Sequence, residues 1–428
     1  MQNPNVQRYA VLACGTIVML VLGLIYAWSI FVAPLEAEFG WTRSETATTF
    51  SISMVMWSCG MLSCGWLMSR FPPRSCFAMG IALIACGFIL SSNVTELWQL
   101  YISYGVFCGF GTGLCYNLWT SVVFAHFSDG TGFAGGVLLM GFGMGAMVLG
   151  SAVSLLIASP VGWRGAFAIL AALAVTLAAA SMYFLRMPDQ KAPAKPKANA
   201  VETGVTLTGG QMLRSPSFWT FALWRVLVMG GAAAVIAQTA PIMASIGADV
   251  AFCSAAVGAL SIGNGCGRPI VGIAYDRIGR DRTLVALAVA GIAIGVALVA
   301  AYVAQNILLL AVALFFEGVL YGGYATVNTT FIKTTYGQAH VATNLGISSF
   351  SLMPFNAVFP VLMAIAFQLA GDYALALGAL PVIAAISLVA AVMTSRLVSQ
   401  LAVGYDAESG DKKRHRHSGK SDLLRREQ

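Results

Sequence analysis

The fold is decided by one stretch of sequence, Asn264-Gly265-Cys266-Gly267-Arg268-Pro269-Ile270-Val271-Gly272, which runs on into Ala274-Tyr275-Asp276-Arg277-Ile278-Gly279-Arg280. The first part lies inside a long apolar segment, where a charged arginine is costly and therefore marks a functional site. The second part is a tight, charged turn at the end of that segment. The stretch predicts a membrane-spanning helix with a cation inside it, followed by a short turn.

The rest of the chain has the composition of a polytopic membrane protein. It has 428 residues, of which 58% are hydrophobic and 10% are charged, and its mean hydropathy is +0.79. A soluble protein would carry roughly 25% charged residues. Apolar segments of about 20 residues recur along almost the whole chain. The predicted fold is an all-α membrane protein of twelve transmembrane helices, over residues 9–35, 44–69, 75–93, 98–122, 132–158, 163–186, 217–242, 251–276, 282–303, 307–332, 342–368 and 373–398.

These spans are predicted to form two pseudo-symmetric halves of six helices. The expected divisions are an N-terminal half, a flexible cytoplasmic linker rich in Pro, Lys and Ala, a C-terminal half and a disordered basic tail, at 1–186, 187–216, 217–399 and 400–428. The turn after the second span, Gly65–Arg74, is repeated in the turn after the eighth, Gly272–Asp281, at an offset of 272 − 65 = 207 residues. Two such halves are typical of a rocker-type secondary transporter.

Basic residues predict the orientation in the membrane. Only Arg43 and Arg164 fall on one side, and Arg225 and Arg268 lie within spans. The other twenty of the 24 Lys and Arg residues fall on the opposite side: Arg8, Arg70, Arg74, Arg186, Lys191, Lys195, Lys197, Arg214, Arg277, Arg280, Arg282, Lys333, Arg396 and seven in the tail. The positive-inside rule then places both termini and the linker in the cytoplasm, in a multi-pass protein of the plasma or inner membrane.

The sequence carries no pattern that indicates an enzyme. There is no P-loop, so ATP is not expected to drive transport. The nine cysteines have no CxxC spacing, and the four histidines fall in loops or the tail, so neither a metal nor a cofactor is predicted. A nucleic-acid partner would need a basic folded face, and none is evident. The expected partners are a small organic anion, a proton in one version of the mechanism, and the lipid bilayer around a monomer.

The turn after the eighth span resembles the signature loop of the major facilitator superfamily. Gly272–Arg280 fits the pattern G-x-x-x-D-R-x-G-R in full, whereas in the first half Ser69 replaces the aspartate and Pro72 the second glycine. The resemblance implies a cytoplasmic gate, latched mainly by the C-terminal half through Asp276, Arg277 and Arg280.

Two further motifs narrow this resemblance. Tyr26-Ala27-Trp28-Ser29-Ile30-Phe31 in the first span and Gly267-Arg268-Pro269 in the eighth are similar to those of the oxalate/formate antiporter family, bacterial relatives of the monocarboxylate transporters. The resemblance implies twelve helices and transport by alternating access.

Arg268 is the first candidate for substrate binding. It lies eight residues before Asp276, about 12 Å inside the cytoplasmic end at 1.5 Å per residue. A guanidinium can grip a carboxylate through two parallel hydrogen bonds, and the resemblance implies that this arginine holds the substrate carboxylate. The alternative is a structural arginine paired with a carboxylate on another helix. Asn264, one turn earlier, either lines the same cavity or bonds a neighbouring helix.

The tenth span carries a polar stripe at positions i, i+4, i+7 and i+11, namely Glu317, Tyr321, Tyr324 and Asn328. Such a stripe is expected to face the bundle interior. Tyr324 and Asn328 match site residues of the family by their position in the helix. Glu317 is the candidate for proton coupling, and the alternative is a static ion pair with Arg268 or Arg225.

The first half offers four further substrate-site candidates. Tyr116 and Asn117 resemble the polar pair that faces the arginine in monocarboxylate carriers, and Tyr26 and Trp28 are predicted to form an aromatic wall, with simple packing as the alternative. For Arg225, near the cytoplasmic end of the seventh span, a gate or structural role is predicted.

The substrate class follows from what surrounds Arg268. Dicarboxylate-transporting relatives place a lysine in span 11, and this chain has none there. Because two charges near one cation would leave one poorly compensated, a monocarboxylate such as lactate, pyruvate or formate is predicted. The alternatives are antiport of an oxalate-like dianion with Arg225 as second cation, an organic-acid sensor that does not transport, and an exporter of hydrophobic drugs. Direction, and symport against antiport, stay open.

Overall fold

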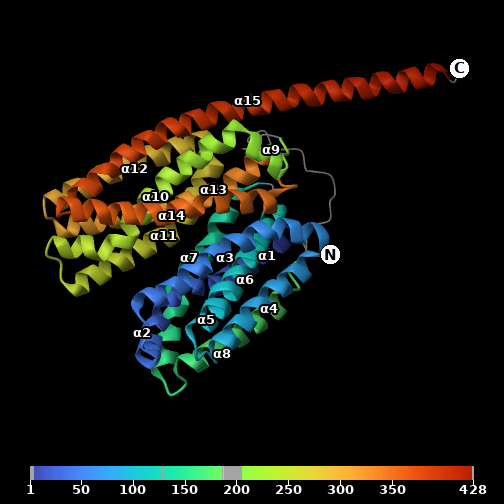
Figure 1. The fold of residues 1–428 in the computed structure, drawn as a ribbon. Coiled ribbons are helices and arrows are strands. Elements are labelled where there is room, and N and C mark those ends of the chain that lie inside the picture. The colour runs from blue at the N-terminus through green and yellow to red at the C-terminus, as the bar shows by residue number, and fades with distance from the viewer. Residues whose placement is uncertain (1–3, 128, 186, 188–204, 427–428) are drawn as a thin grey trace.

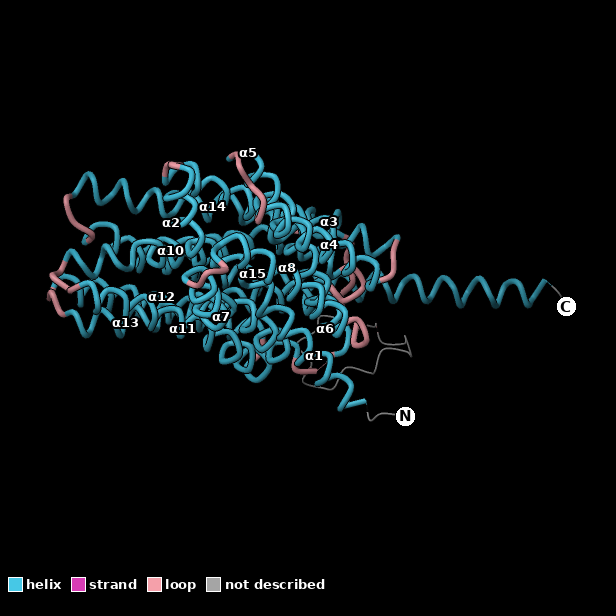
Figure 2. The backbone as a smooth tube through the Cα atoms, turned by 90° about the horizontal axis from the view of Figure 1, so that it is seen from below, coloured by secondary structure: helices cyan, strands magenta, loops and turns pink. Residues whose placement is uncertain are grey.

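A computed structural model describes residues 4–127, 129–185, 187 and 205–426 of the chain. Within these ranges every regular element is helical (Figure 2). A hydrocarbon environment offers no partner for a free N–H or C=O group, so each spanning segment has to satisfy its backbone internally, as a helix does.

The N-terminal half contains six spans built from ten elements. The first span is broken by a 3-10 helix and the fourth by a π-helix. In chain order the elements are α1 (Pro4–Leu22), η1 (Gly23–Ala27), α2 (Trp28–Phe39), α3 (Arg43–Arg70), α4 (Pro73–Ser91), α5 (Leu97–Leu100), η2 (Tyr101–Cys108), α6 (Gly109–His126), α7 (Thr131–Ala158) and α8 (Gly162–Ser181), of which α5 is a short turn before η2.

The C-terminal half contains the other six spans and a short leading helix. Its elements are α9 (Gly209–Arg214), α10 (Pro216–Ser245), α11 (Val250–Ile278), α12 (Arg280–Val303), α13 (Ile307–Tyr336), α14 (Val341–Ala370) and α15 (Ala374–Arg426). Both halves run lengthwise side by side, and the N-terminus, α9 and the end of α15 share one end of the molecule (Figure 1). We call this end the linker end, and the opposite one the far end.

Ten helical segments of the described chain are long and apolar enough to cross a membrane. The remaining two spans of the twelve-helix architecture are α11 and α14, with 29 and 30 residues. At 1.5 Å per residue each is longer than the roughly 30 Å of a bilayer core. In α11 the apolar run is interrupted by Asn264, Arg268 and Asp276. The predicted fold class is therefore confirmed, and α11 is the helix that carries the candidate site.

Glycines bring α11 and α13 together backbone to backbone. A Cβ atom on Gly263 would lie 2.3 Å from the carbonyl oxygen of Phe315, and one on Gly267 would lie 2.1 Å from that of Val319. On the other helix, the same atom on Gly322 would lie 2.1 Å from the carbonyl oxygen of Asn264. Small residues four apart allow this close packing of membrane helices. The two helices therefore hold their side chains in one fixed arrangement.

The helix α7 lies between α1 of its own half and α11 of the other. A Cβ atom on Gly141 would lie 2.4 Å from the carbonyl oxygen of Thr16 in α1. On the opposite face, Cβ atoms on Gly132 and Gly272 would each collide with the other's main chain, 2.2 and 2.0 Å from the carbonyl oxygen. Glycines on one face of α7 thus pack it against α1, and glycines on the other face pack it against α11 of the other half.

The structure describes parts of both predicted connections. The linker is structured from Val205 onward, because Val205, Leu207 and Met212 are buried and Thr208 caps α9 together with Gln211. The predicted tail, by contrast, continues α15 as a helix to Arg426, which projects beyond the bundle (Figure 1). No proline follows residue 381 to interrupt that helix. Residues 188–204 lie outside the described ranges.

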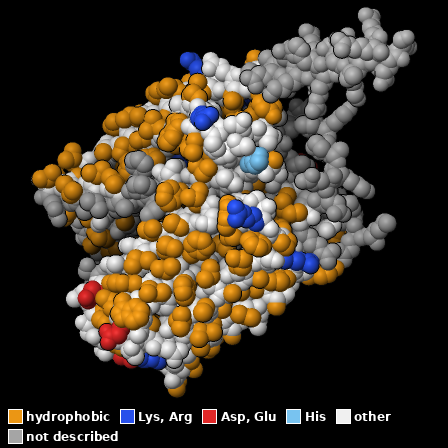
Figure 3. Space-filling model, turned by 45° about the vertical axis from the view of Figure 1, so that its right-hand side comes forward, with side chains coloured by type: hydrophobic (Ala, Val, Ile, Leu, Met, Phe, Trp, Pro, Cys, Tyr) orange, Lys and Arg blue, Asp and Glu red, His pale blue; other side chains and the backbone are white. Residues whose placement is uncertain are grey.

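Charge is unevenly distributed on the surface. Figure 3 shows a face covered mostly by apolar side chains, with Lys and Arg toward the end where the chain termini lie and Asp and Glu gathered at the opposite end. At the far end, Arg164 pairs with Glu38, and the indole N–H of Trp163 donates to the same carboxylate at 2.7 Å. An apolar belt between polar ends fits a protein embedded in a bilayer.

Candidate functional site

Arg268 lies in the middle of the molecule, between the two halves. Its side chain is 5% exposed. One guanidinium nitrogen, Nη1, donates to the carbonyl oxygen of Leu139 in α7 at 2.5 Å, and Nε donates to Oδ1 of Asn264 at 3.4 Å. Among the described residues, no carboxylate pairs with Arg268 and no acceptor bonds its Nη2. A buried cation held only by neutral groups is suited to receive an anion.

The guanidinium of Arg268 contacts α7 at Gly143. A Cβ atom on Gly143 would lie 2.7 Å from Cζ and 2.8 Å from Nη2 of Arg268. The next residue in the chain, Met144, covers Gly265 of α11 in the same contact. Arg268 belongs to the C-terminal half, and its guanidinium packs against the N-terminal half.

Three aromatic rings of the N-terminal half form a cluster beside this contact. Tyr116 of α6 packs edge-on against Trp57 of α3 and Phe142 of α7, with ring centroids 5.3 and 4.9 Å apart. Tyr116 is also within electrostatic range of both Arg268 and Tyr321 of α13. The predicted residues Arg268, Asn264 and Tyr116 are thus brought together, and Tyr321 joins them from the polar stripe.

Asn117 lies away from this group, although it follows Tyr116 directly. Its side-chain amide donates to the carbonyl oxygens of Met61 in α3 and Ala342 in α14, both at 2.7 Å. Consecutive residues of a helix point about 100° apart, so Tyr116 and Asn117 face different neighbours. The structure therefore gives Asn117 a contact between the halves near the linker end, not one with Arg268.

Asn328 is held by Arg225 inside the C-terminal half. The Arg225 side chain is fully buried, and Nη1 donates to Oδ1 of Asn328 and to the hydroxyl of Ser348, both at 2.5 Å. Its Nη2 donates to the carbonyl oxygen of Ser348 at 2.5 Å and the hydroxyl of Ser351 at 2.9 Å. All of these partners are neutral, and the Nε of Arg225 has no partner among the described residues. Arg225 and Asn328 thus join α10, α13 and α14.

Two other predicted residues point away from Arg268. A Cβ atom on Gly291 in α12 would lie 3.2 Å from the Tyr324 hydroxyl, so that side chain points away from the N-terminal half. Trp28 packs against Tyr104 inside the N-terminal half, and its indole donates to the carbonyl oxygen of Thr46 at 3.1 Å. For Trp28 the packing alternative describes the structure. The side chain of Tyr26 lies outside the described residues.

Glu317 is a buried acid, 7% exposed, on α13. Tyr324 is within electrostatic range of it. Among the described residues, Glu317 forms no ion pair, so the alternative of a static pair with Arg268 or Arg225 does not describe this structure. Glu317 lies between Arg268 and the far end, since α13 begins at Ile307.

Asp276 connects the halves at the linker end. Its carboxylate accepts hydrogen bonds from the main-chain N–H groups of Gly132 at 2.8 Å and Phe133 at 2.7 Å, in the first turn of α7. A carboxylate at a helix N-terminus satisfies free N–H groups and complements the helix dipole. Of the other predicted gate residues, Arg277 is exposed and Arg280 pairs with its neighbour Asp281 at 2.8 Å. Among the hydrogen bonds and ion pairs of the described residues, Asp276 is the one of the three that reaches the other half.

Lys333 complements Asp276 at the same place. Its ammonium is buried and donates to the carbonyl oxygen of Phe127, just after α6, and to the hydroxyl of Thr131 at 2.8 Å. The C-terminal half thus places an anion at the start of α7 and a cation at the end of α6, each favourable to the helix dipole. Every hydrogen bond described between the halves lies between this end and the depth of Arg268. The linker end is closed.

Comparison with known proteins identifies the family. The profile of the Major Facilitator Superfamily matches residues 12–351 and 232–417. The chain belongs to the Major Facilitator Superfamily. Family and fold together indicate a multi-pass membrane transporter rather than an enzyme.

Relatives within the superfamily agree with the narrower resemblance. The chain is 28% identical over 335 residues to the oxalate:formate antiporter of Oxalobacter formigenes, covering 77% of this chain and 78% of the relative. It is 33% identical to the rat monocarboxylate transporter 12 over 171 residues, 39% of this chain and 34% of the relative. The Escherichia coli fucose:proton symporter FucP shares the fold, with a TM-score of 0.68, 14% identity and coverage of 90% of this chain and 98% of that chain.

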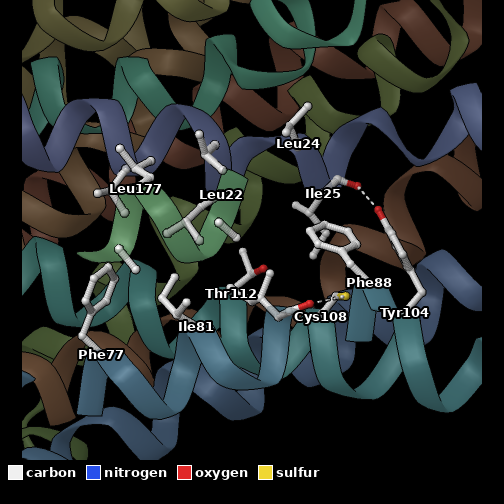
Figure 4. A pocket seen from close by; sticks show the side chains of 15 residues that line it. Leu22, Leu24, Ile25, Phe77, Ile81, Phe88, Tyr104, Cys108, Thr112 and Leu177 are labelled. Atoms are coloured by element: carbon white, nitrogen blue, oxygen red, sulfur yellow. Dashed lines mark hydrogen bonds between the residues drawn. The ribbon is translucent and has the colours of Figure 1, made fainter. Parts of the chain in front are cut away.

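A separate apolar pocket in this superfamily member is not a candidate anion site. It lies inside the N-terminal half, among α1, η1, α4, η2, α6 and α8 (Figure 4). Its lining includes Leu22, Ile81 and Phe88, and the hydroxyl of Tyr104 donates to the carbonyl oxygen of Ile25 at its edge. It contains no cation and none of the predicted substrate residues.

The prediction from sequence missed Trp57, Phe142 and Lys333. An aromatic residue in an apolar span is common, so Trp57 and Phe142 do not stand out in the sequence. Phe142 does lie between two glycines, which is typical of a closely packed helix. Lys333 lies three residues before the end of α13, and its position in the sequence predicts only that it belongs to the cytoplasmic side with the other basic residues. Its burial depends on the other half of the molecule, which the local sequence does not show.

Proposed function

We propose that this protein is a secondary transporter of small monocarboxylates that works by alternating access. The observation that supports this most is the Arg268 guanidinium, which is buried at the junction of the halves without a carboxylate partner among the described residues. The relatives named as oxalate:formate antiporter and monocarboxylate transporter act on carboxylates. Arg268 binds the substrate carboxylate, with Asn264, Tyr116 and Tyr321 around it.

The linker end is the cytoplasmic side in this proposal. Twenty of the 24 Lys and Arg residues belong to that side, as the positive-inside rule requires. The structure then represents a form closed to the cytoplasm, in the plasma or inner membrane, and the transporter acts as a monomer. Substrate enters from the far end, where the described residues form no hydrogen bond between the halves.

Substrate binding changes the charge balance inside the bundle. An unoccupied Arg268 places a full positive charge between two bodies that have to separate during transport. A carboxylate neutralises this charge locally, so movement with bound anion is less costly than movement without it. Opening to the cytoplasm then requires the contacts of Asp276 and Lys333 with the N-terminal half to break.

Glu317 carries a coupled proton in this scheme. It is buried, lies on the same helix as Tyr321 and has no ion-pair partner among the described residues. An unpaired buried acid is favoured in its neutral, protonated form. A proton on Glu317 together with an anion on Arg268 makes the transported pair electroneutral.

The proposal is tested by transport into vesicles that contain the purified protein. Saturable uptake of labelled pyruvate or lactate is expected for the wild type. Arg268→Ala is expected to abolish it while the protein keeps its melting temperature within a few degrees. Arg277→Gln, which removes an exposed arginine from the same helix, is the matched control and should transport normally. Normal affinity in Arg268→Ala would overturn the assignment.

Antiport of an oxalate-like dianion is the second candidate function, favoured by Arg225. This arginine is fully buried, and all of its described partners are neutral, so the C-terminal half holds a second buried arginine besides Arg268. Exchange of oxalate against formate without a proton gradient, lost in Arg225→Gln, would support this function over the first. Exchange that is unaffected by Arg225→Gln would exclude the role of the second cation.

A further inference from the structure

The indole N–H of Trp57 is a buried donor with no acceptor among the described residues. Buried tryptophan N–H groups normally find a partner, and each exception needs an explanation. Two tryptophans of the same half follow the rule, because Trp28 donates to the carbonyl oxygen of Thr46 and Trp163 donates to Glu38. The orphan donor of Trp57 is therefore a feature to be explained.

Trp57 belongs to the aromatic cluster with Tyr116 and Phe142 that lies beside Arg268. Its ring contacts Tyr116 edge-on and stacks against Phe142 at 6.4 Å between centroids. Phe142 is followed by Gly143, which packs on the guanidinium of Arg268. The backbone of Trp57 is fixed as well, since a Cβ atom on Gly113 would lie 1.9 Å from its carbonyl oxygen. A rigid indole is thus presented beside the proposed carboxylate site.

Two other tryptophans lack an indole partner, but in a different setting. Trp119 and Trp224 are completely buried inside their own halves. Trp119 packs against Phe77, and Trp224 packs against Phe221. Trp57, by contrast, is only half-buried and belongs to the cluster at the junction of the halves. This difference makes Trp119 and Trp224 useful controls.

We propose that Trp57 is a specificity-determining residue, which donates a hydrogen bond to an oxygen on the second carbon of the substrate. This inference rests on the proposed function, in which Arg268 holds the carboxylate. The indole nitrogen is a donor only, so it matches a keto or hydroxyl oxygen and has nothing to bond in an unsubstituted chain. The preferred substrates are then 2-oxo and 2-hydroxy monocarboxylates. Propionate, which has only C–H groups at that carbon, leaves the donor unpaired.

The test compares pyruvate, lactate and propionate as competitors for uptake by the full chain in vesicles. Trp57→Phe keeps an aromatic ring and removes the N–H group. We expect the apparent affinities for pyruvate and lactate to fall about three- to tenfold, the range for one hydrogen bond, with that for propionate unchanged. Trp119→Phe and Trp224→Phe should leave the ratio of pyruvate to propionate affinity as it is in the wild type.

Three outcomes would overturn the inference. One is an equal loss of affinity for all three acids in Trp57→Phe, which indicates a packing role only. Another is a wild-type protein that binds propionate as tightly as pyruvate in calorimetry, a measurement that needs no variant. The last is a wild type that takes up none of the three acids, and this result alone also removes the proposed function. If Trp57→Phe does not fold, Trp57→Leu, which also lacks a donor, serves in its place.

Discussion

Gly143 of α7 packs directly on the guanidinium of Arg268, across the junction of the two halves. A methyl group at position 143 would stand 2.7 Å from Cζ, closer than carbon atoms approach without displacement. We therefore expect Gly143→Ala to push the flexible arginine side chain aside while the helices stay in place. The apparent Michaelis constant for carboxylate uptake should rise about tenfold or more, with a small change in melting temperature.

The control for this variant is Gly258→Ala on α11, where a Cβ atom would meet no atom within 4 Å. It should transport as the wild type does. If Gly143→Ala transports with unchanged affinity, the position of the guanidinium against α7 is irrelevant to binding.

Asp276→Asn is expected to weaken the closed linker end. The substitution removes the negative charge that the first turn of α7 receives from the other half. A charge of this kind at a helix terminus contributes about 1–2 kcal/mol when partly buried, so the ratio of closed to open forms should fall roughly five- to thirtyfold. Spin labels on the two halves at this end should show longer distances. Arg277→Gln is the control, and distances as short as in the wild type would contradict the latch.

Asn117→Ala is expected to reduce stability and leave substrate affinity unchanged. The amide of Asn117 donates to two buried carbonyl oxygens, those of Met61 and Ala342, and each of these hydrogen bonds contributes about 0.5–1.5 kcal/mol. Thermal unfolding in detergent should therefore begin several degrees lower. A raised Michaelis constant at normal stability would instead support the role in substrate binding that the sequence predicts for Asn117.

Glu317→Gln is expected to remove the response of uptake to a proton gradient. Glutamine has nearly the same shape and cannot take up or release a proton. Substrate exchange at equal pH on both sides should continue, because Arg268 is untouched. Uptake that still accelerates with an inward proton gradient would exclude Glu317 as the coupling residue.

The sequence sufficed for the parts of the molecule that depend on a single helix. The twelve spans follow from hydropathy, and Asn264 and Arg268 are one turn apart on α11, so their contact follows from the helical repeat. Asp276, the predicted gate residue that bonds the start of α7, lies in a motif that fixes a turn. In each case the relevant spacing is local.

What could not be predicted depends on which face of a helix meets which neighbour. Tyr116 and Asn117 are adjacent in sequence, yet one joins the site and the other ties α6 to α3 and α14. Asn328 lies on the predicted polar stripe of α13, but its side-chain oxygen accepts a hydrogen bond from Arg225 of α10. An amide or an arginine in a span predicts that the side chain has a polar partner, but the sequence does not identify that partner.

The glycine packing of α11 on α13 has a consequence for how the substrate is released. Because the two backbones touch, Arg268 and Tyr321 have to travel as one unit, while Tyr116 and Trp57 belong to the opposite body. In the proposed transport cycle, the carboxylate site is therefore divided between the two halves that move apart. A ligand that both halves hold then loses the contacts of one half when the exit opens.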